Sequence, residues 1–418
     1  MKILCSSINS LPKNLPVGTR AFTFLKASFR PEIGRIATGW LRKLENAGYA
    51  PSIPVWDFML FCFAVYASDV VVLRKNSADG WTRQIELDIT LNDPTPWEAN
   101  KAIAEEMLRV LSGDFWTLHF LPGGPPPPKG NLRPCDRDCV SLLSGGLDSL
   151  IGGIDATTAG RKPIFVSQLA FEDSARQVEY AAALGGSDWH QQWSHKVVFK
   201  GKKETSTRAR SMAFYGLAVL ATSLLSVKRA DILVPENGFI SINPPLLPGR
   251  MASLSTRTTH PQFMALLQEL LDAVCVNAQL SMPYRFMTKG EMLAQCADQD
   301  LLSKFAFNST SCGRFRTYNR THCGRCVPCM VRKAAFQHWR NFDKTIYKFK
   351  DLSGAGKANA DDPMAVACAA LTAENKGIDA FLGATLAFAS DADRPHYRHV
   401  AERGLAELAI LLRSDGII

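Results

Sequence analysis

A six-residue run near the middle of the chain has the residue types of a phosphate-binding loop. The run consists of Ser144, Gly145, Gly146, Leu147, Asp148 and Ser149. Adjacent glycines allow backbone angles that other residues avoid, so consecutive amide N–H groups can surround an anion. A helix that begins in the run adds its positive end. The aspartate repels a bare phosphate, so we expect it to act through Mg²⁺ or to orient the loop.

The run differs from the phosphate loop of kinases and GTPases. That loop needs a lysine followed by serine or threonine near its end, and these six residues contain no lysine. A plain glycine turn between a strand and a helix is the alternative interpretation. The complete six-residue pattern favours nucleotide binding over that alternative.

Four cysteines have the spacing of a structural zinc site. Cys323, Cys326 and Cys329 form a C-x2-C-x2-C pattern, and Cys312 lies upstream of it. Four thiolates suit tetrahedral Zn²⁺ and leave no open position for catalysis. His322 competes as a fourth ligand, and an iron–sulfur cluster also uses four thiolates. We predict zinc, because clustered cysteines in a long chain without an export signal are typical of metal sites.

The residues around these motifs must place them on a common framework. Two helical patterns, at residues 174–184 and 209–227, separate apolar runs that are typical of buried parallel strands. This alternation predicts an α/β fold, with an open parallel sheet and helices on both faces. The predicted strands of that sheet are residues 139–143, 164–167, 196–199 and 231–235.

Residues 122–137 are the clearest boundary in the chain. They include four consecutive prolines, which cannot lie in a helix or a sheet interior and favour an extended linker. Residues 1–121 are therefore predicted to form an N-terminal α+β accessory domain. Residues 138–345 would form the nucleotide-binding domain with its zinc segment, and residues 346–418 a C-terminal helical region.

The N-terminal part contains regular patterns but no catalytic motif. Residues 85–91 and 115–121 have the pattern of strands, and residues 97–111 have the pattern of a helix. The apolar stretch at residues 58–67 is too short to span a bilayer and is predicted to be a buried core element. The first residues lack an apolar run of signal length, so we expect a cytoplasmic protein with no membrane partner.

Composition and net charge limit the classes of protein and of partner that this sequence allows. Hydrophobic residues make up 46% of the chain and charged residues 21%, which is ordinary for a globular protein and excludes wholesale disorder. The net charge of +9 permits a nucleic-acid partner. No block of five or six like charges is present, so a basic surface around a nucleotide pocket is the favoured interpretation.

The glycine-rich run resembles the signature of the PP-loop ATP pyrophosphatase family. The resemblance implies that its six residues bind the pyrophosphate end of ATP, with Mg²⁺, at the carboxyl ends of the strands of an open, Rossmann-like sheet. It also implies an AMP-forming reaction, in which AMP is transferred to a carbonyl oxygen and pyrophosphate is released.

The run and the cysteines together resemble the 7-cyano-7-deazaguanine synthase (QueC-like) family over residues 138–340. Members of that family end in a Thr-Cys segment, a Cys-Gly-x-Cys-x-x-Cys run, and then Arg and Ala. Ser311 with Cys312, the three-cysteine run, Arg332 and Ala334 match these features. Members adenylate 7-carboxy-7-deazaguanine, let ammonia displace AMP, and dehydrate the resulting amide to a nitrile through a second adenylation.

The same resemblance implies functions for residues outside the two motifs. Lys289 and Glu291 match a Lys-x-Glu element that precedes the zinc site, and Arg210 is the counterpart of an arginine in a Pro-Gly-Arg-Asn element. The catalytic residues implied are Asp148, Arg210 and Lys289. Charge on the phosphoryl group would be stabilised by loop amides, Mg²⁺ and Arg210.

The segment that recognises the substrate departs from the family pattern. Members carry a Glu-x-Asp-x-Ser-Gly-Tyr-Pro-Asp-Cys-Arg run, and of these residues only Glu236 is retained here. Glu236, Asn237 and Gly238 are the predicted substrate-binding residues. The departure leaves open how the deazapurine is recognised and which nucleophile reacts.

Enlarged chains of this kind resemble the QueC-like component of bacterial anti-phage (Qat-type) operons. The resemblance implies a protein partner from the same operon, whose amine would capture the adenylated carboxylate. Three alternatives stay open: an ordinary synthase that uses ammonia, a PP-loop enzyme that thiolates tRNA, and an ATP-binding scaffold without catalysis. Thiolation would use Cys275 or Cys296, and Cys275 is expected to pack in the core.

Overall fold

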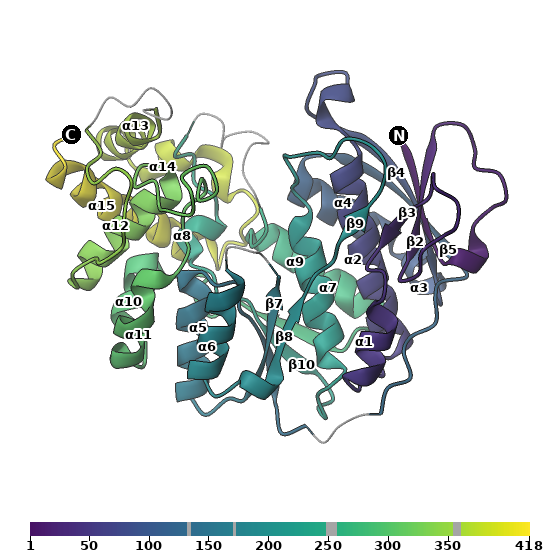
Figure 1. Ribbon diagram of the computed structural model, residues 1–418. Coiled ribbons are helices and arrows are strands. Elements are labelled where there is room, and N and C mark those ends of the chain that lie inside the picture. The colour runs from purple at the N-terminus through teal and green to yellow at the C-terminus, as the bar shows by residue number, and fades with distance from the viewer. Residues whose placement is uncertain (132–134, 170–172, 248–256, 354–360) are drawn as a thin grey trace.

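Two mostly parallel sheets and the helices around them make up the computed structural model (Figure 1). The structure describes residues 1–131, 135–169, 173–247, 257–353 and 361–418. Residues 132–134 of the predicted linker lie outside the described residues. The mixed α/β fold class predicted from the sequence is confirmed.

The sheet that follows the linker is open and wholly parallel. Its strand order is β11-β10-β6-β7-β8, and each of its four pairings is parallel. The direction of strand addition reverses between β6 and β10, so a crevice is expected beyond the carboxyl ends of these two strands. The strands are β6 (Cys139–Leu142), β7 (Pro163–Gln168), β8 (His190–Trp193), β10 (Ala230–Leu233) and β11 (Ala278–Ser281).

Helices cover both faces of this sheet. In Figure 1, α5 and α6 lie on one face, and α7 and α9 lie on the other. The glycine-rich loop precedes α5, and α7 and α9 carry the connections to β10 and β11. The bounds are α5 (Leu147–Thr158), α6 (Ser174–Ala183), α7 (Arg210–Thr222) and α9 (Pro261–Ala273).

The prediction of a strand at residues 196–199 in this sheet is wrong. Val197–Val198 forms β9, which pairs antiparallel with β3 of the other sheet. The edge position next to β7 is occupied by β8 instead, whose residues are polar and half-buried. An edge strand buries less of its surface than a central strand, so it needs no apolar run. Searching the sequence for apolar runs therefore identified residues 196–199 in place of β8.

The N-terminal sheet is parallel and not of the α+β kind predicted. Its order is β5-β4-β1-β2-β3-β9, and all pairings except that of β9 are parallel. Alternating hydrophobicity indicates that one face of a strand is buried, but it does not indicate whether neighbouring strands are parallel. The sequence pattern therefore could not predict the parallel pairing. The strands are β1 (Lys2–Ser6), β2 (Thr19–Phe24), β3 (Gly34–Ile36), β4 (Gln84–Leu91) and β5 (Phe115–Pro122).

Two layers of helices separate the sheets. α2 packs on β4 and on α7, while α4 packs on β5 and on α9. The helix predicted at residues 97–111 is divided at Asn100 into α3 and α4. The bounds are α1 (Trp40–Asn46), α2 (Ile53–Val71), α3 (Thr95–Ala99) and α4 (Lys101–Ser112).

α2 is the most deeply buried helix of this layer. Its length and composition would allow it to cross a membrane, but 83% of its apolar window is buried inside the protein. It is therefore a core helix, as predicted for residues 58–67. One hydrophobic core reaches from Phe22 of the N-terminal sheet through Phe61 to Val140 of the second sheet. The domain limits predicted from the sequence stay predictions.

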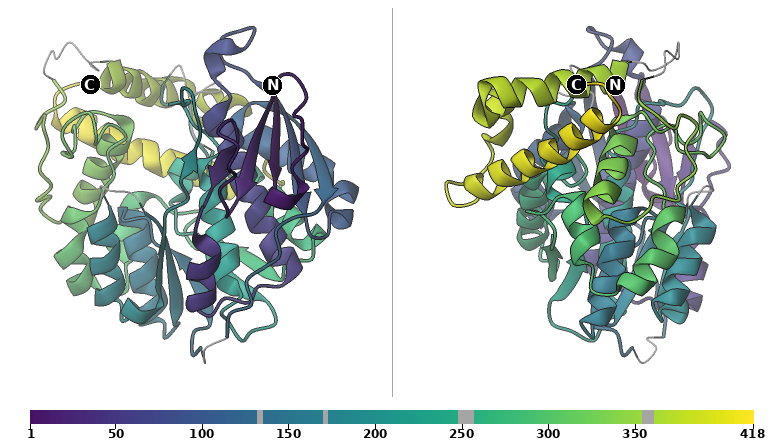
Figure 2. Two further views of the ribbon diagram at one scale, coloured as in Figure 1. Left: turned by 45° about the vertical axis from the view of Figure 1, so that its right-hand side comes forward. Right: turned by 90° about the vertical axis from the view of Figure 1, so that its left-hand side faces the viewer.

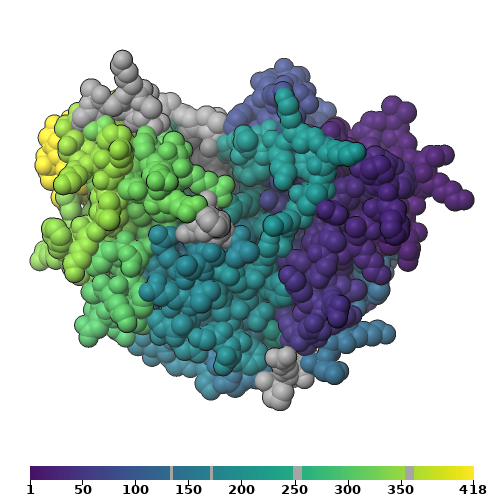
Figure 3. Space-filling view, in the orientation of Figure 1, coloured from purple at the N-terminus to yellow at the C-terminus, as the bar shows by residue number. Residues whose placement is uncertain are grey.

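The remaining helices gather at the other side of the second sheet. In Figure 2, α15, in yellow, lies beside the green helix α12. Figure 3 shows the N-terminal residues in purple and the C-terminal residues in yellow-green on opposite sides of the teal central part. The bounds are α8 (Gly238–Ser241), α10 (Lys289–Gln295), α11 (Gln299–Phe305), α12 (Val327–Trp339), α13 (Asp361–Lys376), α14 (Ile378–Leu382) and α15 (Arg394–Ser414).

Candidate functional site

The glycine-rich loop joins β6 to α5 and is closed by its own serine hydroxyls. Ser149 Oγ accepts the N–H of Ser144 over 3.1 Å and donates to the carbonyl oxygen of Gly146 over 3.0 Å. The Ser144 hydroxyl lies 3.0 Å from that of Ser149 and accepts the N–H of Gly146 over 3.2 Å. Because α5 begins at Leu147, the positive end of the helix lies at the loop.

Gly145 is the position in this loop that requires glycine. Its φ of +87° is rarely adopted by other residues, and a Cβ would lie 2.9 Å from Cβ of Asp173. Its carbonyl oxygen also accepts the N–H of Thr310 over 3.1 Å. The loop is therefore held against the segment that leads to the cysteine cluster.

Replacing Gly145 with alanine is expected to weaken ATP binding about tenfold or more, because backbone strain of about 1–3 kcal/mol would displace the loop. Gly160 offers a matched control, since its φ is +78° and a Cβ there would meet no heavy atom within 4 Å. Titration calorimetry should show weaker ATP binding for Gly145→Ala alone, although backbone strain lowers the melting temperature of both variants. Equal ATP affinities would contradict a phosphate-binding role for the loop.

Asp148 is the buried centre of the site. Its Oδ1 accepts a hydrogen bond from Nζ of Lys289. Its Oδ2 accepts one from Nδ2 of Asn237 over 2.8 Å and one from the Asn237 N–H over 3.2 Å. Burial opposes ionisation of Asp148, but the Lys289 ammonium and these hydrogen bonds outweigh it and lower the pKa of the carboxyl below its ordinary value.

Glu236 is the second carboxyl of the site and is half-buried. It follows β10 and hydrogen-bonds to Asp148, and Nδ2 of Asn237 lies 3.2 Å from its Oε1. Burial, followed by the negative charge of Asp148, raises the pKa of Glu236 well above its ordinary value. The pKa values of the two carboxyls are therefore shifted in opposite directions, so that Glu236 binds a proton more readily than Asp148.

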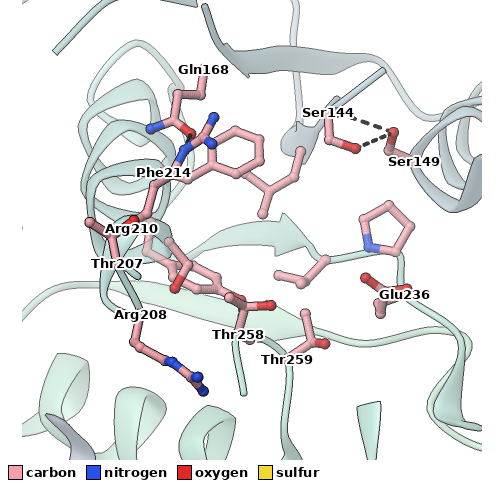
Figure 4. Close-up of a pocket in the computed structure, with 15 residues that line it drawn as sticks. Ser144, Ser149, Gln168, Thr207, Arg208, Arg210, Phe214, Glu236, Thr258 and Thr259 are labelled. Carbon is pink, nitrogen blue, oxygen red and sulfur yellow. Dashed lines mark hydrogen bonds between the residues drawn. The ribbon is translucent and has the colours of Figure 1, made fainter. Parts of the chain in front are cut away.

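A cavity of about 380 Å³ opens at the carboxyl ends of β6 and β10 (Figure 4). Arg210 lies at its side opposite Ser144, and its Nε donates to Oε1 of Gln168 over 3.1 Å. In contrast, the guanidinium of Arg208 is directed away from the loop. Apolar walls with a few polar groups are typical of small-molecule sites. The apolar and aromatic walls come from Leu142, Phe214, Tyr215, Val234 and Pro235.

A second cavity of about 280 Å³ lies on the other side of the loop. Ser144, Ser149 and Glu236 line both cavities, whereas Lys289 and Thr310 line only the second. The second cavity thus combines a cationic side chain, hydroxyl groups and the start of a helix. That combination suits phosphate oxygens.

The four predicted cysteine ligands form a compact, buried cluster. All four Sγ atoms lie within 4.8 Å of one another. The Sγ atoms of Cys312 and Cys326 are 3.9 Å apart, as are those of Cys323 and Cys329. A Zn–S distance of about 2.3 Å in a tetrahedron corresponds to sulfur atoms about 3.8 Å apart. The cluster therefore fits one zinc ion and is too small to enclose several iron atoms.

Backbone N–H groups donate to the sulfur atoms of the cluster. The competing ligand His322 is bonded elsewhere and is not part of the cluster. Cys312 Sγ accepts the N–H of Arg314 and that of Cys323, each over 3.3 Å, and such bonds stabilise thiolates. His322 turns its Nε2 to the N–H of Ser311 over 3.1 Å. The ring is thereby engaged with the backbone, so Cys312 completes the set of four.

Residues 258–340 match the family model described as queuosine biosynthesis protein QueC. No curated protein and no solved structure matches the chain. The match includes Lys289 and all four cysteines, and it begins after the glycine-rich loop and Glu236. The contacts from Lys289 to Asp148 and from Thr310 to Gly145 join the matched part to the loop.

The predicted site residues are only partly brought together. Asp148, Lys289 and Glu236 are in contact, and Arg210 lies across the first cavity. Asn237 is fully buried and lines neither cavity, since it binds Asp148 and caps α8 by accepting the Ile240 N–H over 2.9 Å. Gly238 also lines neither cavity. It packs directly on the backbone of Arg285, since a Cβ at Gly238 would lie 2.1 Å from the carbonyl oxygen of Arg285.

Several residues of the site carried no signal in the sequence. Gln168 ends β7, and Thr258 and Thr259 precede α9, yet all three line the first cavity. Thr310 lines the second. Gln168 could have been found, because side chains at the carboxyl ends of neighbouring parallel strands face the same crevice.

The two cysteines considered for thiolation lie away from both cavities. Cys275 is exposed, so the expectation that it packs in the core is wrong. It follows the end of α9 at a φ of +61°, where the chain turns outward. Cys296 is buried, and burial raises its pKa to about 12, which disfavours a reactive thiolate.

Proposed function

We propose that the protein is an ATP-dependent, AMP-forming ligase. It would activate the carboxylate of a 7-carboxy-7-deazaguanine-like compound as an adenylate and transfer the acyl group to an amine. The observation that carries this proposal is the contact of Asp148 with both Lys289 and Glu236 beside the glycine-rich loop. The QueC match at residues 258–340 supports deazaguanine-type chemistry with ATP.

The two cavities offer a place for each half of ATP. The second cavity would take the pyrophosphate end, against the loop amides and Lys289. The first cavity, with its apolar walls, would take the planar substrate and the adenylate. Their shared border at Ser144 and Glu236 would then hold the α-phosphorus, where the bond to pyrophosphate breaks.

The reaction would have two steps, and side chains and loop amides of this protein would stabilise the charge that develops. A carboxylate oxygen of the substrate bonds to the α-phosphorus as pyrophosphate leaves, and Lys289 with the loop amides stabilises the leaving group. An amine then attacks the carbonyl carbon, AMP departs with the former carboxylate oxygen, and the amine loses a proton. Arg210, across the cavity, would stabilise charge on the α-phosphoryl group.

Asp148 and Glu236 fit the requirements of a Mg²⁺ site. Asp148 is buried and Glu236 is half-buried, both offer hard oxygen ligands, and a cation between them would offset the repulsion of two negative charges. Bound Mg²⁺ would neutralise phosphate charge. In this proposal Asn237 and Lys289 orient the Asp148 carboxylate toward it.

The acceptor amine is proposed to belong to a protein partner encoded in the same operon, within a Qat-type anti-phage system in the cytoplasm. Two features support a changed acceptor. The family's substrate run is absent after Glu236. In its place, Phe239 of α8 packs so closely on α15 that a Cβ at Gly404 would lie 2.3 Å from its ring.

The decisive experiment uses ¹⁸O-labelled 7-carboxy-7-deazaguanine with Mg²⁺ and ATP. We expect AMP and pyrophosphate, and we expect ¹⁸O in AMP once an amine is supplied. The double variant Ser144→Ala, Asp148→Ala serves as the inactive control. Formation of ADP, or no nucleotide cleavage even with operon partners, would leave an ATP-binding scaffold or an RNA-directed enzyme as the better explanation.

Mass spectrometry of the same reaction distinguishes the acceptors. An acyl adduct on an operon protein supports the proposal. Free amide or nitrile formed from ammonia, with no protein adduct, would instead identify an ordinary 7-cyano-7-deazaguanine synthase.

Replacing Arg210 with glutamine is expected to lower kcat for AMP formation about 10- to 100-fold, because one donor to the developing charge is lost. Arg229→Gln is the control, since this exposed arginine pairs with Asp272 next to the amino end of β10. Steady-state kinetics should show an unchanged rate for the control. A rate for Arg210→Gln equal to that of the control would exclude Arg210 from the reaction.

A further inference from the structure

The segment that leads into the helix carrying Arg210 is held by a residue from the N-terminal part of the chain. α7 begins at Arg210, and its N-cap residue, Ala209, has no side-chain group that could bond the free N–H groups. Asp69 of α2 holds the chain just before the helix instead. Its Oδ2 accepts the N–H of Arg208 and that of Ala209, each over 2.7 Å, and its side chain is fully buried.

A network of buried ion pairs fixes Asp69. Arg83 Nη2 donates to Asp69 over 2.5 Å and to Asp114 over 2.6 Å. Arg74 binds the same Asp114 over 2.9 Å and also donates from Nε to the carbonyl oxygen of Ser206 over 3.1 Å. Residues 204–209, which lead into α7, are therefore held by the N-terminal part at several points.

The helix that carries Lys289 is held in a corresponding way by the C-terminal part. α10 begins at Lys289 after the N-cap residue Thr288. The Thr288 hydroxyl donates to Glu407 of α15, whose side chain is buried. Gly290 allows this approach, because a Cβ there would lie 2.7 Å from Oε1 of Glu407.

We propose that Asp69 and Glu407 are positioning residues for the reaction. Each lies outside the QueC match, and each binds the residue or residues that immediately precede a helix whose first residue is a cation at the cavities. Asp69 acts through Arg210, and Glu407 acts through Lys289. This inference rests on the proposed function for the roles of those two cations.

The physical reason is that charge stabilisation depends on placement to within about 1 Å. The first residue of a helix can be displaced by fraying unless the chain that enters the helix is held in place. The parts of the chain outside the match therefore contribute to the rate of the reaction itself, beyond any contact that they make with a partner.

Asp69→Asn tests the first half, with Asp57→Asn as a matched control. Asp57 lies on the same helix, is equally buried, and also accepts two backbone N–H groups, from Asn92 and Asp93. At saturating ATP we expect kcat for AMP formation to fall about 10- to 100-fold in Asp69→Asn and to stay within about threefold in Asp57→Asn. Equal rates in the two variants would overturn the inference.

Two further measurements separate positioning from loss of stability. Hydrogen exchange should show lost protection of the amides of residues 208–211 in Asp69→Asn only, a result that holds whether or not the wild type forms AMP. In an Arg210→Gln background, Asp69→Asn should lower the rate further by less than about twofold. If protection is lost nowhere, or if the two effects multiply, Asp69 does not act through Arg210.

A milder variant keeps the test decisive if Asp69→Asn does not fold. Glu204 accepts the N–H of Arg74 over 2.8 Å and that of Ser206 over 2.7 Å. Glu204→Gln loosens the same segment without removing a buried charge. We expect a several-fold lower kcat with the same local loss of protection, and an unchanged kcat would count against the inference.

Glu407→Gln tests the second half, with Glu402→Gln on the exposed side of the same helix as the control. We expect kcat to fall about tenfold in Glu407→Gln and in Thr288→Val, and to recover in Thr288→Ser, which keeps the hydroxyl. Recovery by serine would not occur if the methyl packing of Thr288 alone mattered. If the wild type cleaves no ATP at all, the proposed function fails, whereas active wild type with equally active variants refutes only this inference.

Discussion

Asp148→Asn is expected to lower the rate of AMP formation by about 100- to 1,000-fold, the effect typical of removing one group that stabilises developing charge. Asparagine has nearly the same shape and keeps one oxygen, so the fold should be retained. The variant loses the negative charge that pairs with Lys289 and that, with Glu236, would hold Mg²⁺. The AMP produced per minute, measured across a range of Mg²⁺ concentrations, reports the effect.

The control for this experiment is Asp155→Asn on the same helix. Asp155 lies at the opposite end of α5, accepts the hydroxyl of Tyr284 over 2.5 Å and the N–H of Ala297 over 2.8 Å, and lines neither cavity. Its variant should lose stability and retain activity within a few-fold. If Asp148→Asn kept more than a tenth of the wild-type rate, a central role for this carboxylate would have to be abandoned.

Motifs that are local in sequence could be predicted, because their geometry is set by neighbouring residues. The two serine hydroxyls of the loop bond to each other and to backbone groups of the loop. The cysteines cluster for a similar reason, since three of them lie within one turn and the start of α12. Residue types and their spacing were therefore enough to predict both features.

Contacts between distant segments could not be predicted in this way. Asp69 and Arg208 are 139 positions apart, and Thr288 and Glu407 are 119 positions apart. Nothing in the local pattern of α2 or α15 distinguishes these two acidic residues from others. Their importance depends on which helix end each one reaches, and only the fold determines that.

The prediction of which segments form the strands of each sheet failed for a different physical reason. The short run around Val197 is apolar because it packs against the N-terminal sheet, whereas β8 is polar because it lies at an edge. Likewise, the N-terminal strands alternate in hydrophobicity because helices cover one face. Apolar periodicity measures burial, and burial alone does not assign a strand to a sheet or give its direction.

Cys326→Ser is the second substitution for which we expect a very large effect. Cys326 supplies one of the four sulfur atoms and is also the N-cap residue of α12. Binding of structural zinc contributes about 10–16 kcal/mol in zinc-finger peptides. Losing even a third of that would lower the free energy of unfolding by about 3–5 kcal/mol and the melting temperature by roughly 10 °C.

The matched control is Cys368→Ser, because Cys368 is an exposed free cysteine on α13. Zinc released by a mercurial reagent and measured with a chromogenic chelator should be about one ion per chain in the control and far less in Cys326→Ser. Iron with visible absorption, or no metal in the wild type, would contradict the assignment of zinc.

We expect loss of zinc to affect the proposed ATP site as well. The segment from Thr310 to Cys312 connects the two, since Thr310 donates its N–H to Gly145 and lines the second cavity. Arg332 holds the same segment through the hydroxyls of Ser309 and Ser311. At a temperature where Cys326→Ser is still folded, weaker ATP binding would therefore show that the zinc segment supports the loop. Unchanged ATP binding would restrict the metal to stabilising the fold.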